Sequence, residues 1–204
     1  MKVLLINGSP HEKGCTYTAL REVADILEKE GIDTQIFHIG TGPVHGCIAC
    51  GACDKLGKCV FDDDPANEMM QLMQEADGIV VGSPVYYAGP NGALCALLDR
   101  AFYAGSGFEF KPAAAVVSAR RGGATATFDR LNKYFTIKRM PVVASQYWNG
   151  VHGLTPEDVK KDEEGLQTMR TLGYNMAWML KAIAYGGQKR PRIEPYLRTN
   201  FIRD

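Results

Sequence analysis

The sequence has no excess of either charge, because 23 lysine and arginine residues balance 23 aspartate and glutamate residues. A neutral balance gives no electrostatic reason to expect nucleic acid or an anionic membrane as a partner. The sequence also lacks an apolar run of about 18 residues, which a membrane-spanning helix requires. The first apolar run, residues 3–6, is too short for the core of a signal peptide and is better interpreted as a buried strand.

A disulfide framework is also not expected, because the chain has 204 residues and a composition rich enough in apolar side chains for a full-sized core. Four of the six cysteines lie within residues 47–59. Cysteines clustered in this way more often bind metal or perform redox chemistry. We therefore expect a cytoplasmic protein in a reducing compartment.

Strand and helix patterns alternate along the chain. Near-continuous apolar runs predict strands buried on both faces of a parallel sheet, at residues 3–6, 78–81, 113–117 and 141–144, with a weaker alternating strand at 34–38. Amphipathic stretches predict helices between them, at residues 16–30, 67–75, 92–103, 124–137 and 156–185. The alternation predicts one α/β domain, residues 1–185, with a doubly wound five-stranded parallel sheet and helices on both faces.

Two segments break this alternation. Residues 39–63 form a cysteine-rich insertion, longer than the roughly two to six residues usual between a strand and a helix, and long links are often functional. Residues 186–204 are rich in proline and basic residues. We expect them to form an extended C-terminal tail that serves as a surface strap.

The loop after the first strand combines glycines, small hydroxyl side chains and the start of a helix. Backbone N–H groups and the helix dipole converge in such a loop, which predicts a phosphate site. The dinucleotide fingerprint is absent, because its second glycine is missing and His38 stands where an acidic residue is needed. The P-loop pattern is absent too, because Gly8 and Gly14 are one residue too far apart and Cys15 replaces the lysine.

This loop resembles that of the flavodoxin-like FMN reductases, which reads G-S-P, a basic residue, and then G-N-T. The matching residues are Gly8, Ser9, Pro10, Gly14 and Thr16. The resemblance implies a flavodoxin-like sheet with strand order 2-1-3-4-5. It also implies an FMN phosphate site made by Ser9, His11, Gly14, Cys15 and Thr16.

Two residues of the loop depart from the family pattern. His11 replaces an arginine or lysine, and is either a phosphate partner or a solvated loop histidine. Cys15 replaces an asparagine. It is either a small residue tolerated at a helix start, where the backbone N–H survives any substitution, or a thiol made reactive by the helix N-terminus.

Two later loops are predicted to surround the flavin ring, because ligands of this fold bind beyond the carboxyl ends of the strands. Residues 82–89 resemble the family's S/T-P-x-Y stretch, which implies ring contacts from Pro84, Val85, Tyr86 and Tyr87. The two tyrosines either cover the ring or are ordinary core aromatics.

The loop after the strand 113–117 also ends in glycines before a helix. Its candidate flavin contacts are Ser118, Arg120, Gly122 and Gly123. Arg120 or the neighbouring Arg121 either stabilises an anionic reduced flavin or is a surface charge.

The most specific pattern is C-x2-C-x2-C-x5-C, formed by Cys47, Cys50, Cys53 and Cys59. Three cysteines at this spacing wrap a loop around one corner of an iron–sulfur cubane, and the fourth is close enough to complete the set. Zinc sites usually pair two C-x2-C motifs across a longer spacer. The spacing therefore favours a [4Fe–4S] cluster over an empty thiol loop, and both over zinc. Cys95 is interpreted as an inert buried thiol.

The position of this pattern, between the second strand and the second helix, resembles the iron–sulfur flavoproteins. In that family four cysteines hold a [4Fe–4S] cluster near FMN at a subunit interface, and acidic residues follow the last cysteine, as Asp62-Asp63-Asp64 do here. The resemblance implies an oxidoreductase that passes electrons through the cluster and FMN to a small-molecule acceptor. A ferredoxin-type protein or NAD(P)H is the expected donor.

Two other functions stay open. One is a cluster-free NAD(P)H:FMN or quinone reductase, in which the cysteine loop only shapes the active site. The other is a flavodoxin-like electron carrier without turnover, which the neutral charge disfavours.

A homodimer or homotetramer is expected from the last helix. Its main apolar stripe consists of Met169, Leu172, Met176, Leu180 and Ile183. Off this stripe lie Tyr174, Trp178, Met179 and Tyr185, which favours a second buried face against another subunit or against the tail.

Overall fold

The structure is a computed structural model, and it describes residues 1–187 and 189–195. In chain order its elements are β1 (Lys2–Asn7), α1 (Cys15–Lys29), β2 (Asp33–His38), α2 (Cys53–Leu56), α3 (Ala66–Glu75), β3 (Gly78–Tyr86), β4 (Gly89–Pro90), α4 (Gly92–Ala104), β5 (Ala113–Ala119), α5 (Ala124–Ile137), β6 (Gly150–His152), α6 (Pro156–Val159) and α7 (Glu163–Tyr185). None of the described helices combines the length and apolarity needed to cross a membrane.

The sheet has the strand order β2-β1-β3-β5-β6, and the two-residue β4 pairs only with β3. All neighbours in this order pair in parallel, whereas β4 runs antiparallel to β3. With β4 set aside, the order is the expected 2-1-3-4-5. The flavodoxin-like fold is therefore confirmed, with one short strand more than predicted.

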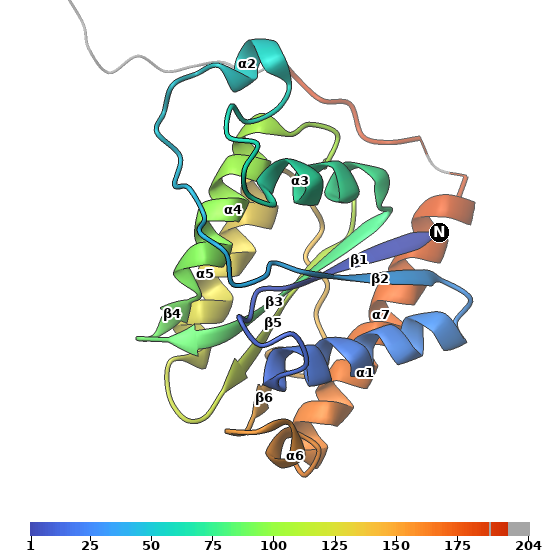
Figure 1. The fold of residues 1–204 in the computed structure, drawn as a ribbon. Coiled ribbons are helices and arrows are strands. Elements are labelled where there is room, and N and C mark those ends of the chain that lie inside the picture. The colour runs from blue at the N-terminus through green and yellow to red at the C-terminus, as the bar shows by residue number, and fades with distance from the viewer. Residues whose placement is uncertain (188, 196–204) are drawn as a thin grey trace, which may run out of the picture.

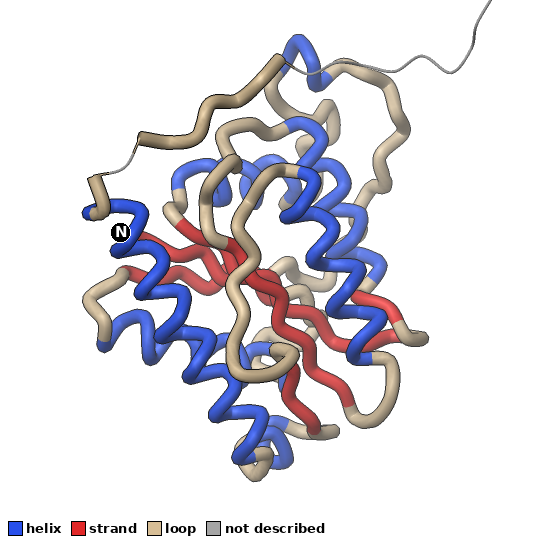
Figure 2. The backbone as a smooth tube through the Cα atoms, turned by 180° about the vertical axis from the view of Figure 1, so that it is seen from behind, coloured by secondary structure: helices blue, strands red, loops and turns tan. Residues whose placement is uncertain are grey.

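Helices cover both faces of the sheet (Figures 1 and 2). Side chains of a strand alternate between faces, so β1 contributes to two cores. Val3 and Leu5 pack with α1 and α7, whereas Leu4 and Ile6 pack with α3, α4 and α5. All four side chains are fully buried, as expected for a parallel sheet covered on both sides.

The fifth strand differs from the prediction. Residues 141–144 make only a single bridge, between Val142 and Ala113, and the parallel ladder is formed by β6 instead. After Val143 the hydroxyl of Ser145 donates to the carbonyl of Tyr147 (2.6 Å) and accepts the Tyr147 N–H (3.3 Å). Such local bonds compete with a sheet ladder, so the chain leaves the sheet before it rejoins at Gly150.

The last predicted helix, 156–185, is divided into α6 and α7. Asp162 starts α7 by accepting the N–H of Gly165 (2.9 Å), so the chain has a new helix start inside the predicted span. Of the predicted stripe, Ile183 is exposed, while Met169, Leu172, Met176 and Leu180 are buried. The predicted tail 186–204 lies partly outside the described residues, which omit 188 and 196–204.

The parallel register brings three loops to one edge of the sheet. Asn7 at the end of β1 lies opposite Gly82, and Pro84 lies opposite Ser118 near the end of β5. The loops after β1, β3 and β5 therefore meet where ligands bind in doubly wound sheets.

Candidate functional site

The phosphate loop, residues 8–14, ends at an open helix terminus. Gly14 is the N-cap of α1 and has no side chain to offer the first turn. The N–H groups of Thr16 and Tyr17 have no acceptor among the described residues. Exposed N–H groups and the positive end of the helix dipole together favour an anion such as phosphate.

Two buried asparagines hold the phosphate loop in place. Asn7 accepts the N–H of Ser9 (3.1 Å) and donates to the carbonyl of Glu12 (2.9 Å). From the start of α4, Asn91 donates to the carbonyl of Gly8 (2.7 Å). A side chain on Gly8 would meet Leu94 at 2.4 Å, so only glycine allows this close approach. Neither asparagine was predicted to have this role, although Asn91 stands directly before a helix, where asparagine is a cap signal.

Hydroxyl groups from two loops meet beside the helix start. Thr16 Oγ1 and Ser118 Oγ lie 2.8 Å apart, and both residues are buried. Only one proton is used between the two oxygens, so the second hydroxyl can donate to a ligand. Ser9 Oγ accepts the N–H of His11 (3.1 Å), which leaves the Ser9 proton free as well. The three predicted hydroxyls thus border the open terminus of α1.

Two histidines and a cysteine near the phosphate loop have different surroundings. His11 is exposed, whereas His38, which had no predicted role in binding, braces the loop with its Nε2 at 2.8 Å from the carbonyl of Ser9. Burial raises the pKa of the Cys15 thiol, and the carboxylates of Asp158 and Glu157 add to the rise. A reactive thiol needs a lowered pKa, so the structure favours the interpretation of Cys15 as a small residue at a helix start.

The second loop forms a projecting hairpin between β3 and β4. Its two central residues, Tyr87 and Ala88, have φ angles of 49° and 57°, as a two-residue hairpin turn requires. Non-glycine residues in this conformation are strained by about 1–3 kcal/mol and often mark functional sites. Tyr86 is 44% exposed and Tyr87 is fully exposed, so the interpretation of both as core aromatics is wrong.

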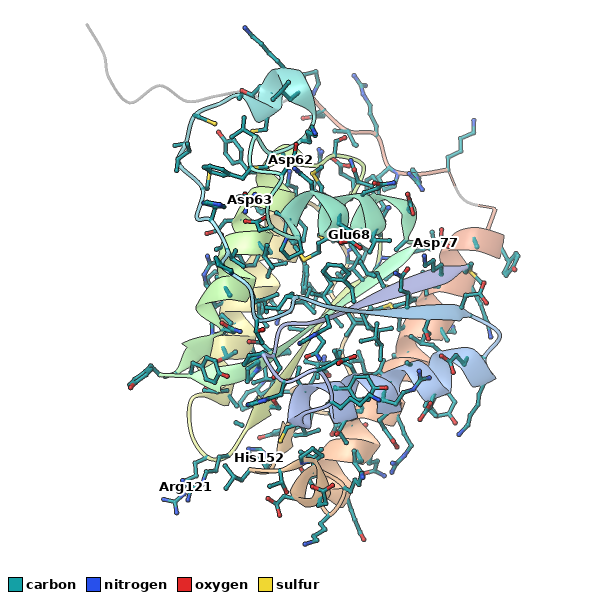
Figure 3. The ribbon with its side chains drawn as sticks, viewed as in Figure 1. Asp62, Asp63, Glu68, Asp77, Arg121 and His152 are labelled. Atoms are coloured by element: carbon teal, nitrogen blue, oxygen red, sulfur yellow. The ribbon has the colours of Figure 1, made fainter. Side chains whose placement is uncertain are left out.

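The third loop packs against this hairpin through a glycine. Gly123 has a φ of 90°, and a side chain there would meet Cα of Ala88 at 2.8 Å and Cγ1 of Val85 at 2.9 Å. Arg120 and Arg121 are exposed and form no ion pair with a described residue. Figure 3 shows Arg121 pointing away from the body of the molecule.

The cysteine loop, residues 46–59, lies at the other end of the molecule. Figure 1 shows it rising from β2 to α2, while Figure 3 places Asp62 and Asp63 beneath it and Arg121 at the far end. Left-handed backbone at Ala49, Gly51 and Gly57 turns the loop back on itself.

Four of the chain's six free thiols line one hollow, and they are those of Cys47, Cys50, Cys53 and Cys59. The other walls are largely apolar and include Ile48, Val60, Phe61 and Tyr103. Among the described residues, no three His, Cys, Asp or Glu side chains lie close enough together to hold a metal ion as they stand. The donor set nevertheless fits a thiolate-bound iron–sulfur cluster, because it consists of four sulfurs around an apolar space.

A buried ion pair anchors the base of this loop. The side chains of Arg100 on α4 and Asp64 are almost completely buried against each other. Burial opposes the charge of Arg100, but its hydrogen bonds to Asp64 and Cys59 outweigh burial and raise the pKa of the guanidinium. Burial likewise opposes the charge of Asp64, and hydrogen bonds from Arg100, His45 and Ala66 still hold its pKa below the ordinary value. No sequence pattern had assigned Arg100 a role.

The sheet, the open helix terminus and the three loops at one sheet edge define a flavodoxin-like α/β protein. The profile of the NADPH-dependent FMN reductases matches residues 1–154. The chain therefore belongs to the NADPH-dependent FMN reductase family and is an FMN-dependent oxidoreductase.

Relatives of nearly equal length agree with this placement. An iron–sulfur flavoprotein of Methanocaldococcus jannaschii is 36% identical over 192 residues, which cover 90% of this chain and 99% of the relative. An iron–sulfur flavoprotein of Methanosarcina thermophila is 30% identical over 188 residues, 90% of this chain and 97% of the relative. A solved archaeal flavodoxin shares the fold, with a TM-score of 0.60 at 16% identity over 89% of this chain and 99% of the flavodoxin.

Proposed function

We propose that this chain is an oxidoreductase of the iron–sulfur flavoprotein type. In this proposal FMN occupies the three loops at the sheet edge, and Cys47, Cys50, Cys53 and Cys59 hold a [4Fe–4S] cluster. The observation that carries the proposal is that all four cysteines line one hollow. When bound, the cluster exchanges single electrons and FMN one or two, so the pair can link a one-electron donor to a two-electron acceptor.

The protein groups at the flavin loops have separate tasks. The N-terminus of α1, with the hydroxyls of Ser9, Thr16 and Ser118, holds the phosphate. The N–H groups of the second and third loops would bind the flavin ring, and Tyr86 and Tyr87 would supply aromatic surface. His11, Arg120 and the glycine N–H groups at 14, 122 and 123 remain proposed contacts.

The positions of the two sites also support a proposal about assembly. Asn91, at the start of α4, bonds the phosphate loop, whereas Arg100 and Tyr103, near its end, line the cysteine hollow. A helix of 13 residues is about 20 Å long, so the two sites of one chain lie far apart. We infer that a homodimer or homotetramer brings the cysteine loop of one chain to the flavin of another.

Exposed aromatic residues on α7 agree with an assembled protein. Tyr174, Trp178 and Tyr185 are 51%, 68% and 78% exposed, so their face of the helix is not covered by described residues. Free thiols at all six cysteines fit a reducing, cytoplasmic compartment. A ferredoxin-type protein or NAD(P)H is the proposed donor, and a quinone or an oxygen species the proposed acceptor.

Anaerobic iron and acid-labile sulfide analysis tests the cluster. We expect about four irons and four sulfides per chain in the wild type. Cys59→Ser should lower both, while Cys95→Ser, which changes a cysteine outside the loop, should not. Flavin absorbance without iron in the wild type would contradict the proposal.

A second candidate function is a cluster-free NAD(P)H:FMN or quinone reductase. The family match favours it, and the hydrogen bonds that hold the phosphate loop involve no residue of the cysteine loop. Stopped-flow mixing with NADPH separates the two: rapid stoichiometric bleaching of the flavin in iron-free protein supports the reductase. Bleaching that requires a loaded cluster supports the iron–sulfur flavoprotein, and a flavin that cycles only with protein partners identifies a carrier.

A further inference from the structure

The guanidinium of Arg100 joins both ends of the cysteine loop. Its Nε–H donates to Sγ of Cys59 (3.1 Å), Nη1 donates to the carbonyl of His45 (3.1 Å), and Nη2 donates to the carbonyl of Phe61 (3.2 Å). Nη1 also bonds Asp64. The side chain is only 1% exposed, so these groups take the place of water around a buried cation.

Asp64 also connects the two ends of the cysteine loop. Its carboxylate accepts the N–H of His45 (2.9 Å) and the N–H of Ala66 (3.1 Å) at the start of α3. The ring of His45 stacks on Phe61 with 4.2 Å between the centroids. We name Arg100 and Asp64 the clamp, because together they fix residue 45 against residues 59–66 and so close the loop that carries the cysteines.

The clamp also places a positive charge at one cysteine and not at the others. Among the described hydrogen bonds from a charged side chain, that of Arg100 to Cys59 is the one that ends on a cysteine sulfur. Adding an electron to a thiolate-bound cluster increases its negative charge. A fixed cation and an N–H donor at a ligand sulfur in an apolar site therefore stabilise the reduced form.

We propose that Arg100 is a positioning residue for the iron–sulfur site, which preforms the cysteine loop and raises the reduction potential of the cluster through Cys59. This inference rests on the proposed function, since it requires a cluster at the four cysteines. Lysine cannot replace the arginine fully, because a single ammonium lacks the planar fork that contacts several acceptors at once.

The competing role is a purely structural link between α4 and the loop. Such a link would affect stability and leave the potential of a bound cluster unchanged. Two variants separate these roles: Arg100→Lys keeps the charge without the fork, and Arg100→Met removes the charge. Arg130→Met is the matched control, because Arg130 also pairs with a carboxylate on α4, that of Asp99, and the cysteine on which its charge acts is Cys95, outside the loop.

The first measurement is an anaerobic redox titration of the reduced cluster followed by electron paramagnetic resonance. We expect Arg100→Met to lower the reduction potential of the cluster by about 59 mV. For one electron this corresponds to a tenfold change in the oxidised-to-reduced ratio at a given potential. Arg100→Lys should cause a smaller shift, and Arg130→Met none. A loaded Arg100→Met protein with the wild-type potential would overturn the electrostatic part of the proposal.

The second measurement needs no cluster, and it keeps the two proposals distinguishable. In iron-free protein with retained FMN, the rate of amide hydrogen exchange is measured at His45, whose N–H bonds Asp64, and at Val143, whose N–H bonds Ala113 in the sheet. Arg100→Met should accelerate exchange at His45 severalfold and leave Val143 unchanged, while unchanged exchange at His45 would overturn the preformed loop. Wild-type protein that binds no iron under anaerobic reconstitution refutes the proposed function, whereas a loaded wild type with unaltered variants refutes only this inference.

Discussion

The phosphate loop and the cysteine loop are held to the body of the protein in different ways. The phosphate loop is locked by Asn7 and Asn91, which are nearly inaccessible to solvent, and by glycine contacts that no other residue allows. Cys47 and Cys50, in contrast, lie on an exposed loop whose firm attachments are at its base. The difference indicates that the phosphate loop is preorganised over its whole length, whereas the cysteine loop is fixed mainly at its base.

The largest expected effect comes from breaking the clamp. Asp64→Asn leaves the buried charge of Arg100 without its partner, which should cost about 3–5 kcal/mol in the free energy of unfolding. Urea denaturation of FMN-loaded protein measures it. Glu109→Gln removes the partly exposed pair with Arg139 and should cost less than about 1 kcal/mol. Equal effects of the two substitutions would show that the clamp is not the main attachment of the loop.

The same pair makes the protein sensitive to acid. The pKa of Asp64 is lowered in the folded state, so its contribution to stability is present above about pH 4 and is lost as the pH falls through the folded pKa. Thermal unfolding between pH 7 and pH 3 should therefore show a steeper loss for the wild type than for Asp64→Asn. Parallel curves for the two proteins would contradict this assignment.

On the flavin side the sharpest test is a glycine. Gly123→Ala introduces a side chain at a positive φ and against Ala88, and it should weaken FMN binding at least about tenfold, or about 1.4 kcal/mol. Gly122→Ala is the control, because a side chain there meets nothing within 4 Å. Fluorescence quenching on titration of apoprotein with FMN gives both affinities. Similar affinities would mean that the contact between the second and third loops does not shape the flavin site.

The smallest expected effect concerns one hydroxyl. Thr16→Val removes a bond to Ser118 and a proposed phosphate donor, and it should raise the Kd for FMN by about three- to tenfold. Cys15→Ser should leave this Kd nearly unchanged, because the backbone N–H remains. If instead Cys15→Ser weakens FMN binding more than Thr16→Val does, then the Cys15 thiol contributes to binding, although its raised pKa argues against a reactive role.

Most of the fold follows from local patterns in the sequence. Neighbours in the chain determine buried runs, such as 3–6 and 113–117, and helix starts, such as residue 92. The predicted bounds of these elements therefore lie close to those in the structure. The fifth strand was misplaced because Ser145 competes with the ladder through bonds that apolar periodicity does not report. The break before α7 depends likewise on a single cap, Asp162.

The sequence predicts the residues of the candidate site that lie close together in the chain as a motif. It does not predict the residues that only folding brings together. Cysteine spacing and glycine loops are visible in the sequence. Arg100 and Asp64 are 36 residues apart, and Asn91 reaches Gly8 across 83 positions, so no spacing rule connects them. These residues hold the loops through long-range hydrogen bonds, so their roles become visible only in the folded structure.

Native mass spectrometry of anaerobically purified protein weighs both proposed bound groups in one experiment. We expect, for each chain, the mass of the polypeptide plus one FMN and one [4Fe–4S] cluster, within a dimer or tetramer. A mass that contains FMN but no cluster, or zinc in its place, would contradict it.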